Sequence, residues 1–255
     1  MIPMDKLAKH VQQHPYPMLF ATISGAHLYG FPSADSDFDL RGTHLLPLSD
    51  VIGLFQTEDT IDKSWLEDGL EIDLVTHDAA KFFGLMLKKN GYVLEQVFSP
   101  LIVYATPEHD ELKAIASDCI TKHHWHHYKG FAQTQWKMVQ QAETPLVKPL
   151  LYTYRVLMTG IHLMRYGKIE ANLGVLNEEF GVPLVTELMM QKVEGQEKEL
   201  LDTKDWEQHS RQVEALFSKL ENEAQKSSLP EHPTARAALN DLLIRLRRRG
   251  QSSTC

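Results

Sequence analysis

Asp37 and Asp39, two aspartates separated by one residue, are the strongest candidates for catalytic residues in this chain. From Asp37 to Arg41, charged and apolar residues alternate, and a strand places every second side chain on one face. The two Cα atoms would lie about 6.6 Å apart at roughly 3.3 Å per residue. Phe38 and Leu40 would face an apolar core. The spacing predicts a strand whose two carboxylates converge on one or two hard divalent cations.

A glycine turn precedes these aspartates. The apolar run 18–23 predicts a buried strand that enters Ser24, Gly25 and Ala26, where a short helix would begin. The free N–H groups at a helix start suit a phosphate. Ser24 and Gly25 are therefore candidate phosphate-binding residues. A phosphate-binding turn followed by two carboxylates on a strand indicates metal-assisted phosphoryl or nucleotidyl transfer.

The acidic stretch has two other interpretations. A calcium-binding loop that starts at Asp35 would need Gly at its sixth position and Glu at its twelfth, where the chain has Leu40 and Leu46. That interpretation fails. The acids could also form the solvated face of an edge strand, but the glycine turn at a workable distance upstream favours a site.

The glycine turn and the aspartates together resemble the signature of the DNA polymerase beta nucleotidyltransferase superfamily, and within it the RNA-repair-pathway (RlaP-type) family. The residues that carry the resemblance are Ser24-Gly25, Tyr29-Gly30, Ser36-Asp37-Phe38-Asp39 and Arg41-Gly42. Ala26 departs from the pattern, which has Ser there, and so removes a hydroxyl expected to contact the nucleotide phosphates. The resemblance implies an enzyme that transfers a nucleoside monophosphate from a triphosphate such as ATP to an acceptor hydroxyl, with Mg²⁺ or Mn²⁺ as cofactor.

The resemblance also implies a third carboxylate on the strand that pairs beside the first two. In the alternating run 70–75, Asp73 is the best match and Glu71 is the alternative on the same face. Asp37, Asp39 and Asp73 are thus the expected catalytic metal ligands. Ser36 is an expected nucleotide-binding residue.

Arg41 lies on the same face as the acids, two residues beyond Asp39. Its guanidinium can pair with a carboxylate or reach a substrate phosphate through its fork of donors. Both roles belong to a site residue, and Arg41 is included among the expected nucleotide-binding residues.

The expected fold class is α+β: a small mixed polymerase beta-like sheet with helices in residues 1–106, followed by an α-helical substrate- and nucleotide-binding domain in residues 107–255, with the active site in the cleft that separates them. Alternation and turn residues predict strands at 18–23, 37–46, 59–65, 70–76 and 101–104, with a hairpin turn at 67–69. Three- and four-residue periodicity and capping residues predict helices at 4–13, 25–30, 51–55, 78–89, 92–98, 108–119, 122–142, 148–166, 183–193, 202–226 and 234–249.

Lys148, Tyr152 and Arg155 fall at steps of four and three, so they share one face of the predicted helix 148–166. The resemblance implies that basic and aromatic residues of the helical half hold the triphosphate and base, and these three are the candidates. A solvated polar stripe is the alternative. His123 and His127 would also share a helix face, either as a metal-binding pair or as a surface histidine cluster.

The composition limits the classes of partner and the compartment that we expect for this protein. A formal net charge of −8 argues against sequence-independent coating of nucleic acid, although a local basic patch could still grip RNA. The two cysteines, Cys119 and Cys255, suit a reducing compartment. No apolar run approaches the ~20 residues of a membrane span, and a signal-peptide layout is absent. We expect a soluble cytoplasmic protein that does not enter membranes.

The sequence does not identify the acceptor of the transferred group. RNA with tRNA-like ends, a protein and a small molecule are the alternatives, as is a non-catalytic module that senses a nucleotide or binds a protein. The arginines at 245 and 247–249 could contact an RNA backbone. Cations also favour a helix C-terminus because of its dipole, and this simpler interpretation is preferred.

Overall fold

The structure, a computed structural model, describes residues 2–55 and 57–252. These residues form two compact units. The sheet unit comprises residues 2–24, 37–119 and 232–252, and the helical unit comprises residues 25–36 and 120–231. Each unit is discontinuous in sequence. The division predicted above, a single cut after residue 106, stays a prediction.

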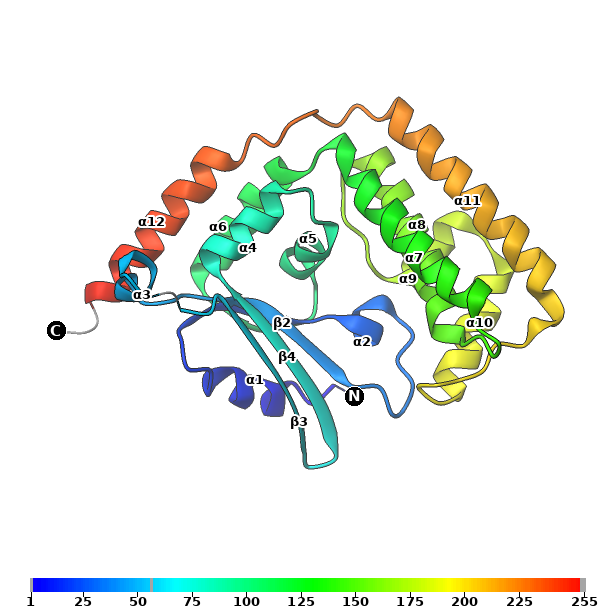
Figure 1. Cartoon of the computed structure of the whole chain (residues 1–255), viewed down its shortest axis with the longest axis horizontal. Coiled ribbons are helices and arrows are strands. Elements are labelled where there is room, and N and C mark those ends of the chain that lie inside the picture. The colour runs from blue at the N-terminus through cyan, green and yellow to red at the C-terminus, as the bar shows by residue number, and fades with distance from the viewer. Residues whose placement is uncertain (1, 56, 253–255) are drawn as a thin grey trace. The chain divides into compact units, whose positions relative to one another are not determined.

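The sheet unit combines a five-stranded sheet with helices on both of its faces (Figure 1). Its strands are β1 (Met18–Ile23), β2 (Phe38–His44), β3 (Thr60–Glu67), β4 (Leu70–Asp78) and β5 (Ile102–Ala105). Its helices are α1 (Met4–Gln12), α3 (Leu48–Ile52), α4 (Ala79–Leu87), α5 (Gly91–Phe98), α6 (Pro107–Ala116), the 3₁₀ turn η1 (Ser117–Cys119) and α12 (Arg236–Ser252).

The sheet is mixed, with strand order β3-β4-β2-β1-β5. Strands β2 and β4 run parallel, and every other neighbouring pair is antiparallel. The predicted hairpin is confirmed: Glu67 pairs with Leu70 across a two-residue turn. Asp68 and Gly69 take φ angles of 52° and 77°, as a type I′ turn requires. The parallel pairing of β2 with β4 places Asp39 opposite Asp73.

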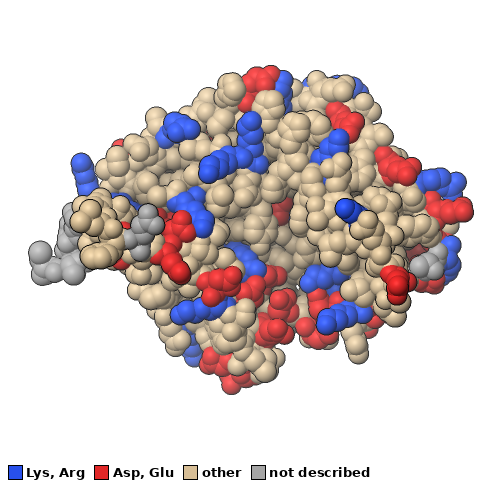
Figure 2. All heavy atoms as spheres, viewed as in Figure 1, with Lys and Arg blue, Asp and Glu red and all other residues tan. Residues whose placement is uncertain are grey.

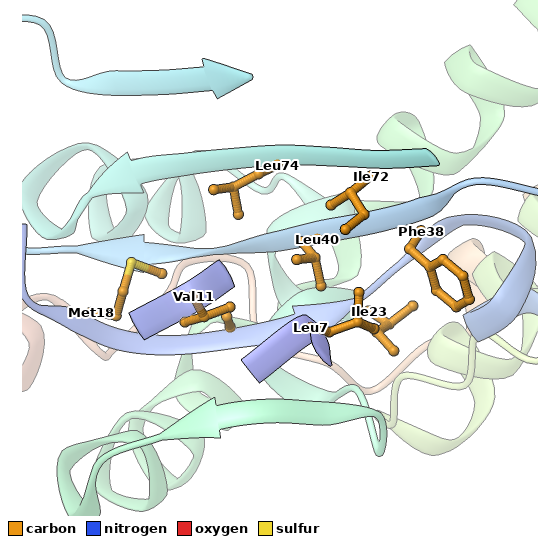
Figure 3. Packing of buried hydrophobic residues seen from close by; sticks show 9 residues of the cluster. Leu7, Val11, Met18, Ile23, Phe38, Leu40, Ile72 and Leu74 are labelled. Carbon is orange, nitrogen blue, oxygen red and sulfur yellow. The ribbon is translucent and has the colours of Figure 1, made fainter. Parts of the chain in front are cut away.

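One face of the sheet packs against α1. Leu7 and Val11 of this helix meet the apolar residues that alternate along the strands, including Leu40 of β2 and Leu74 of β4 (Figure 3). These side chains are almost fully buried. Since alternation sends Asp39 to the opposite face, the apolar floor predicted beneath the acids is present.

The opposite face carries α4, α5 and α6 (Figure 1). Phe20 of β1 stacks on His109 of α6, with ring centroids 4.4 Å apart. The Asp78 carboxylate caps α4 by accepting the Ala80 N–H. Arg247 of α12 donates to both oxygens of Asp78 at 2.5 and 2.6 Å.

Two further arginines of this run also bind acids of the sheet unit. Arg245 pairs with Glu111, and Arg249 pairs with Glu108. The preference against an RNA role for this run has a structural reason, because Arg245, Arg247 and Arg249 hold α12 to its own unit.

The helical unit is built around a long central helix. It contains α2 (Gly25–Tyr29), η2 (Lys122–His124), α7 (Trp125–Gln141), α8 (Val147–Tyr166), α9 (Leu173–Phe180), α10 (Pro183–Glu194), η3 (Thr203–Asp205) and α11 (Trp206–Lys226). Helices α7, α9, α10 and α11 pack around α8. Helix α9 was not predicted, although Asn172 caps it and Gly181 ends it in the left-handed conformation.

The segment 25–36 packs inside the helical unit. The Arg155 guanidinium lies over the Tyr29 ring, 3.8 Å from its centroid. Gly30 takes a φ of 88°, and a Cβ there would meet the Asn172 side chain at 2.6 Å. A glycine is therefore needed at this position for backbone and space alike.

Cys119 is buried, and burial raises the pKa of its thiol to about 12. Cys255 lies outside the described residues. Among the helices of the described chain, none has the length and apolarity that crossing a membrane would demand.

The close approach of β1 and β2 gives a first prediction. A Cβ at Gly42 would lie 2.2 Å from the Phe20 carbonyl oxygen, a backbone atom that cannot move aside. We expect Gly42→Ala to lower the free energy of unfolding by about 3 kcal/mol or more, measured by urea denaturation. Gly84→Ala in α4 is the control, since its Cβ meets open space, and a gain of about 0.5–1 kcal/mol is expected. Equal effects of the two changes would contradict this account.

His109 gives a second prediction. Burial, with help from Lys113, lowers the pKa of His109 to about 4. The unfolded value is about 6.5, so the unfolded chain binds more protons between pH 6.5 and 4, and stability falls as pH falls through this window. The slope contributed by His109 is at most about 1.4 kcal/mol per pH unit. His109→Phe keeps a ring on Phe20, and its stability measured from pH 7 to 4.5 should decline less steeply than that of wild type. If the stability of His109→Phe and that of wild type fall equally with pH, His109 is not the source of the pH dependence.

Candidate active site

The acidic residues of the sheet unit gather where β2 meets β4. Strand β2 spans Phe38–His44, so it is shorter at both ends than the predicted strand 37–46. Asp39 is its second residue, and Asp37 directly precedes it. Asp73 is the residue opposite Asp39 on β4. Glu71, the alternative third acid, is exposed and pairs instead with Leu66 of β3.

Arg41 binds both of the opposed carboxylates. One terminal nitrogen (Nη2) donates to Asp39 Oδ1 at 2.5 Å and to Asp73 Oδ2 at 2.8 Å. The other (Nη1) donates to the carbonyl oxygens of Leu40 and Asp73 at 3.0 and 2.7 Å, and Nε donates to the Tyr92 hydroxyl at 3.1 Å. All five donors of the guanidinium are thus engaged.

The environment of this cluster keeps Arg41 charged. Burial by itself would lower the pKa of Arg41, but Tyr92, Asp39 and Asp73 together raise it above its usual value. Burial raises the pKa of the Tyr92 hydroxyl, so Tyr92 stays neutral at physiological pH. Two aspartates and one arginine leave one negative charge on the cluster. Ser64 of β3 adds a hydrogen bond to Asp73 Oδ1 at 3.0 Å.

The donor set fits a hard divalent cation in its chemistry. Asp37, Asp39 and Asp73 offer only carboxylate oxygens, the ligands that Mg²⁺ and Mn²⁺ prefer. Over the described part of the chain, no group of three or more His, Cys, Asp or Glu side chains is arranged to hold a metal ion. In the present arrangement the cation that bridges Asp39 and Asp73 is the Arg41 guanidinium.

The glycine turn has the backbone that the sequence indicates. Gly25 begins α2 with a φ of 62°, a conformation that favours glycine. The Ser24 N–H donates to the Asp39 carbonyl oxygen at 2.8 Å. Ser24 is fully buried, and among the described residues its hydroxyl has no hydrogen-bond partner. Ser24 thus ties the turn to the strand that carries the acids.

The candidates from the helical half all contact other residues of the helical unit. Arg155 is 2% exposed, and its guanidinium stacks on Tyr29. Tyr152 meets the Tyr29 ring edge-on at 5.4 Å. Lys148 pairs with Glu197, and the Ser36 hydroxyl donates to the same carboxylate at 3.2 Å.

Sequence reasoning missed several partners in both clusters. They are Tyr92 and Ser64 in the sheet unit, and Ser33, Lys192 and Glu197 in the helical unit. Tyr92, Lys192 and Glu197 lie in segments far from the candidates predicted from the sequence, and no spacing rule marks them. Ser64 lies nearer, opposite Asp73 across the predicted hairpin, and Ser33 lies three residues before Ser36.

The histidine cluster is divided between different environments. His124 is buried, whereas His123 binds Glu231 at 2.8 Å and stacks on His126. His127 packs edge-on against Tyr128. In the described part of the chain, these histidines belong to no group of three or more His, Cys, Asp or Glu side chains that could hold a metal ion. The choice between a metal pair and a surface cluster stays a prediction.

A mixed sheet that bears two opposed aspartates after a Ser-Gly turn has the layout of a polymerase beta-like nucleotidyltransferase. The comparison with protein families agrees: residues 2–245 match the RlaP family, described as the RNA repair pathway DNA polymerase beta family. The chain belongs to this family. The resemblance and the fold class inferred from the sequence are confirmed.

Two curated relatives are similar to part of the chain. The protein MJ0002 of Methanocaldococcus jannaschii is 32% identical over 158 residues, which cover 60% of this chain and 63% of the relative. YcgL of Bacillus subtilis is 24% identical over 168 residues, which cover 65% of this chain and 64% of the relative. The matches thus span just under two thirds of these relatives. A solved nucleotidyltransferase-like protein from Exiguobacterium sibiricum is similar over 88% of this chain and 73% of its own, with 13% identity and a TM-score of 0.34.

The role of Arg41 can be tested through stability. Arg41→Met leaves Asp39 and Asp73 opposed without a cation, and we expect the free energy of unfolding at neutral pH to fall by about 3 kcal/mol. Adding Asp73→Asn removes the repulsion and should restore part of the loss. Urea denaturation of the single and double variants measures both effects. A double variant that is less stable than Arg41→Met would contradict the electrostatic explanation.

Proposed function

We propose that this protein is a metal-dependent nucleotidyltransferase that moves a nucleoside monophosphate from a nucleoside triphosphate to an acceptor hydroxyl. The observation that carries the proposal is the pair Asp39 and Asp73. These two carboxylates lie opposite each other on parallel strands and are bridged by the Arg41 guanidinium. Membership of a polymerase beta-type family supports the same reaction class.

In the proposed reaction the acceptor oxygen attacks the α-phosphorus of the triphosphate. The bond from this phosphorus to the bridging oxygen breaks, pyrophosphate leaves, and the acceptor proton passes to a base. Asp37, Asp39 and Asp73 would hold Mg²⁺ or Mn²⁺. When bound, such ions lower the pKa of the acceptor hydroxyl and neutralise charge on the pyrophosphate.

The other candidates would bind the nucleotide. Lys148 would contact phosphate oxygens, and Tyr152 has a partly exposed ring suited to stacking on a base. Arg155 would act by fixing Tyr29 and Tyr152, since it is buried against their rings. Gly25 supplies the left-handed turn ahead of α2.

RNA ends are the acceptor that the family description favours. On the face drawn in Figure 2, lysines and arginines are interspersed with acidic residues. This mixed distribution of charges favours a local contact with RNA over binding across a broad basic surface. A salt titration of RNA binding tests the point, because phosphate contacts make the affinity fall with rising salt. A slope near zero would favour a protein or small-molecule acceptor.

Calorimetric titration tests the proposed enzyme against the alternative, a non-catalytic module that senses a nucleotide or binds a protein. Each of the four ribonucleoside triphosphates is titrated with and without Mg²⁺ into wild type and into the double variant Asp37→Ala/Asp39→Ala. Metal-dependent binding that the double variant loses supports the proposal. Binding that ignores both metal and mutation would favour the non-catalytic alternative.

The proposal predicts a sharp kinetic effect at Asp39. We expect Asp39→Asn to reduce transfer from an α-labelled triphosphate to RNA at least about 100-fold, since a metal ligand supports several kcal/mol of transition-state stabilisation. Asp62→Asn on β3 removes the same charge from an exposed position and should leave transfer unchanged. Full activity of Asp39→Asn would exclude the assigned mechanism.

A further inference from the structure

The helical unit holds a carboxylate in a cage of cations and hydroxyls. Glu197 Oε2 accepts from Lys192 Nζ at 2.8 Å, from Ser36 Oγ at 3.2 Å and from Ser33 Oγ at 3.4 Å. Its Oε1 accepts from Lys148 Nζ. Two ammonium groups and two hydroxyls thus converge on one anion.

The cage is buried on its Lys192 side and partly exposed on its Lys148 side. Lys192 is fully buried, and its ammonium also donates to Ser33 Oγ at 2.6 Å and to the Gln196 carbonyl oxygen at 3.3 Å. The side chains of Lys148 and Glu197 are 35% and 27% exposed. A buried ammonium group requires an anion beside it, because an unpaired charge in the interior is costly.

The two cations lie on helices, whereas the anion lies in a turn, where the Asp35 carboxylate accepts the Glu197 N–H at 3.0 Å. Lys148 lies in the first turn of α8, and Lys192 lies in the last turn of α10. Glu197 belongs to the turn that follows α10, between Gly195 and Leu200. Leu200 anchors the far end of that turn through a β-bridge to Leu146. A rotation of the Glu197 side chain would take the carboxylate out of the cage without moving either helix or the backbone of the turn.

We propose that Lys148, Lys192, Ser33 and Ser36 form a subsite for the polyphosphate chain of a nucleoside triphosphate, and that Glu197 occupies it as an internal competing anion until the ligand displaces it. This inference rests on the proposed function and adds to it two further binding residues, Ser33 and Lys192, and an internal competitor, Glu197. Ammonium and hydroxyl donors suit phosphate oxygens as well as they suit a carboxylate. A polyphosphate carries more negative charge than Glu197, so it binds the two lysines more strongly.

The first test measures binding of inorganic tripolyphosphate by calorimetry in the presence of a chelator, without divalent metal. Glu197→Gln keeps the size of the side chain and removes its charge. We expect this variant to bind tripolyphosphate about tenfold more tightly than wild type, since the ligand no longer expels a charged competitor. Glu194→Gln, an exposed residue in the last turn of α10, is the matched control and should bind as wild type does.

The second test removes a cation from the cage. Lys148→Met should weaken tripolyphosphate binding about tenfold or more. Lys148 is partly exposed, so this variant is expected to fold. Lys198→Met changes an exposed lysine of the same turn as Glu197 and should have no effect. Circular dichroism and thermal midpoints establish that each variant is folded.

Several results would overturn the proposal. Tripolyphosphate binding by folded Glu197→Gln that equals or falls below wild type would mark Glu197 as a structural clamp. An equal gain in Glu194→Gln would mean that only long-range charge matters. Orthophosphate binding as tight as that of tripolyphosphate would exclude a polyphosphate chain as the ligand.

The experiment also separates this inference from the proposed function. Tripolyphosphate binding needs no metal, so Asp39→Asn should retain it. A wild type that binds tripolyphosphate with the expected response to Glu197→Gln, but transfers no nucleotide, would support the subsite and contradict the enzyme. A wild type that transfers nucleotide, but binds no tripolyphosphate, would contradict the subsite alone.

Discussion

The ion pair that joins Arg41 to Asp39 and Asp73 is the interaction on which the acidic site depends. The parallel register of β2 and β4 places the two carboxylates opposite each other, and neither can move away without breaking the sheet. Like charges at this separation and partial burial repel strongly. A cation between the two carboxylates relieves this repulsion, and Arg41 supplies it. Under the proposed function, Arg41 both stabilises the acids and competes with the metal for them.

In the helical unit, two positive charges rather than two negative charges need a counter-ion. Lys148 and Lys192 are brought together by α8 and α10, and Glu197 neutralises them. A charged site that awaits a ligand is unstable when it is empty, because a buried charge without a partner costs several kcal/mol. In both units the chain supplies its own counter-ion. Binding of a ligand then becomes an exchange of partners, so the affinity reflects the difference between two ion pairs.

Local patterns in the sequence predicted most of the fold. Alternation along Asp37 to Arg41 and along β4 located both acidic strands, and Asp68-Gly69 located the hairpin. The partners of the charged residues could not be predicted in this way. Tyr92 is 51 residues from Arg41, and Glu197 is 49 residues from Lys148. Only tertiary packing brings such residues together, and no helical or strand period records it. Helix α9 was missed although its capping residues were visible, because a helix of eight residues is too short to show a clear repeat of apolar positions.

The segment 25–36 links the two clusters covalently. It leaves the sheet unit after Ser24 and returns at Asp37, and the Ser24 N–H bond to the Asp39 carbonyl oxygen closes its base. Near its end, the Asp35 carboxylate accepts the Glu197 N–H at 3.0 Å, and the Ser36 hydroxyl binds the Glu197 side chain. Ser36 directly precedes Asp37. Under the proposal that a ligand displaces Glu197, that ligand would replace the contacts of Ser36, the residue next to Asp37, which is the first of the proposed metal ligands.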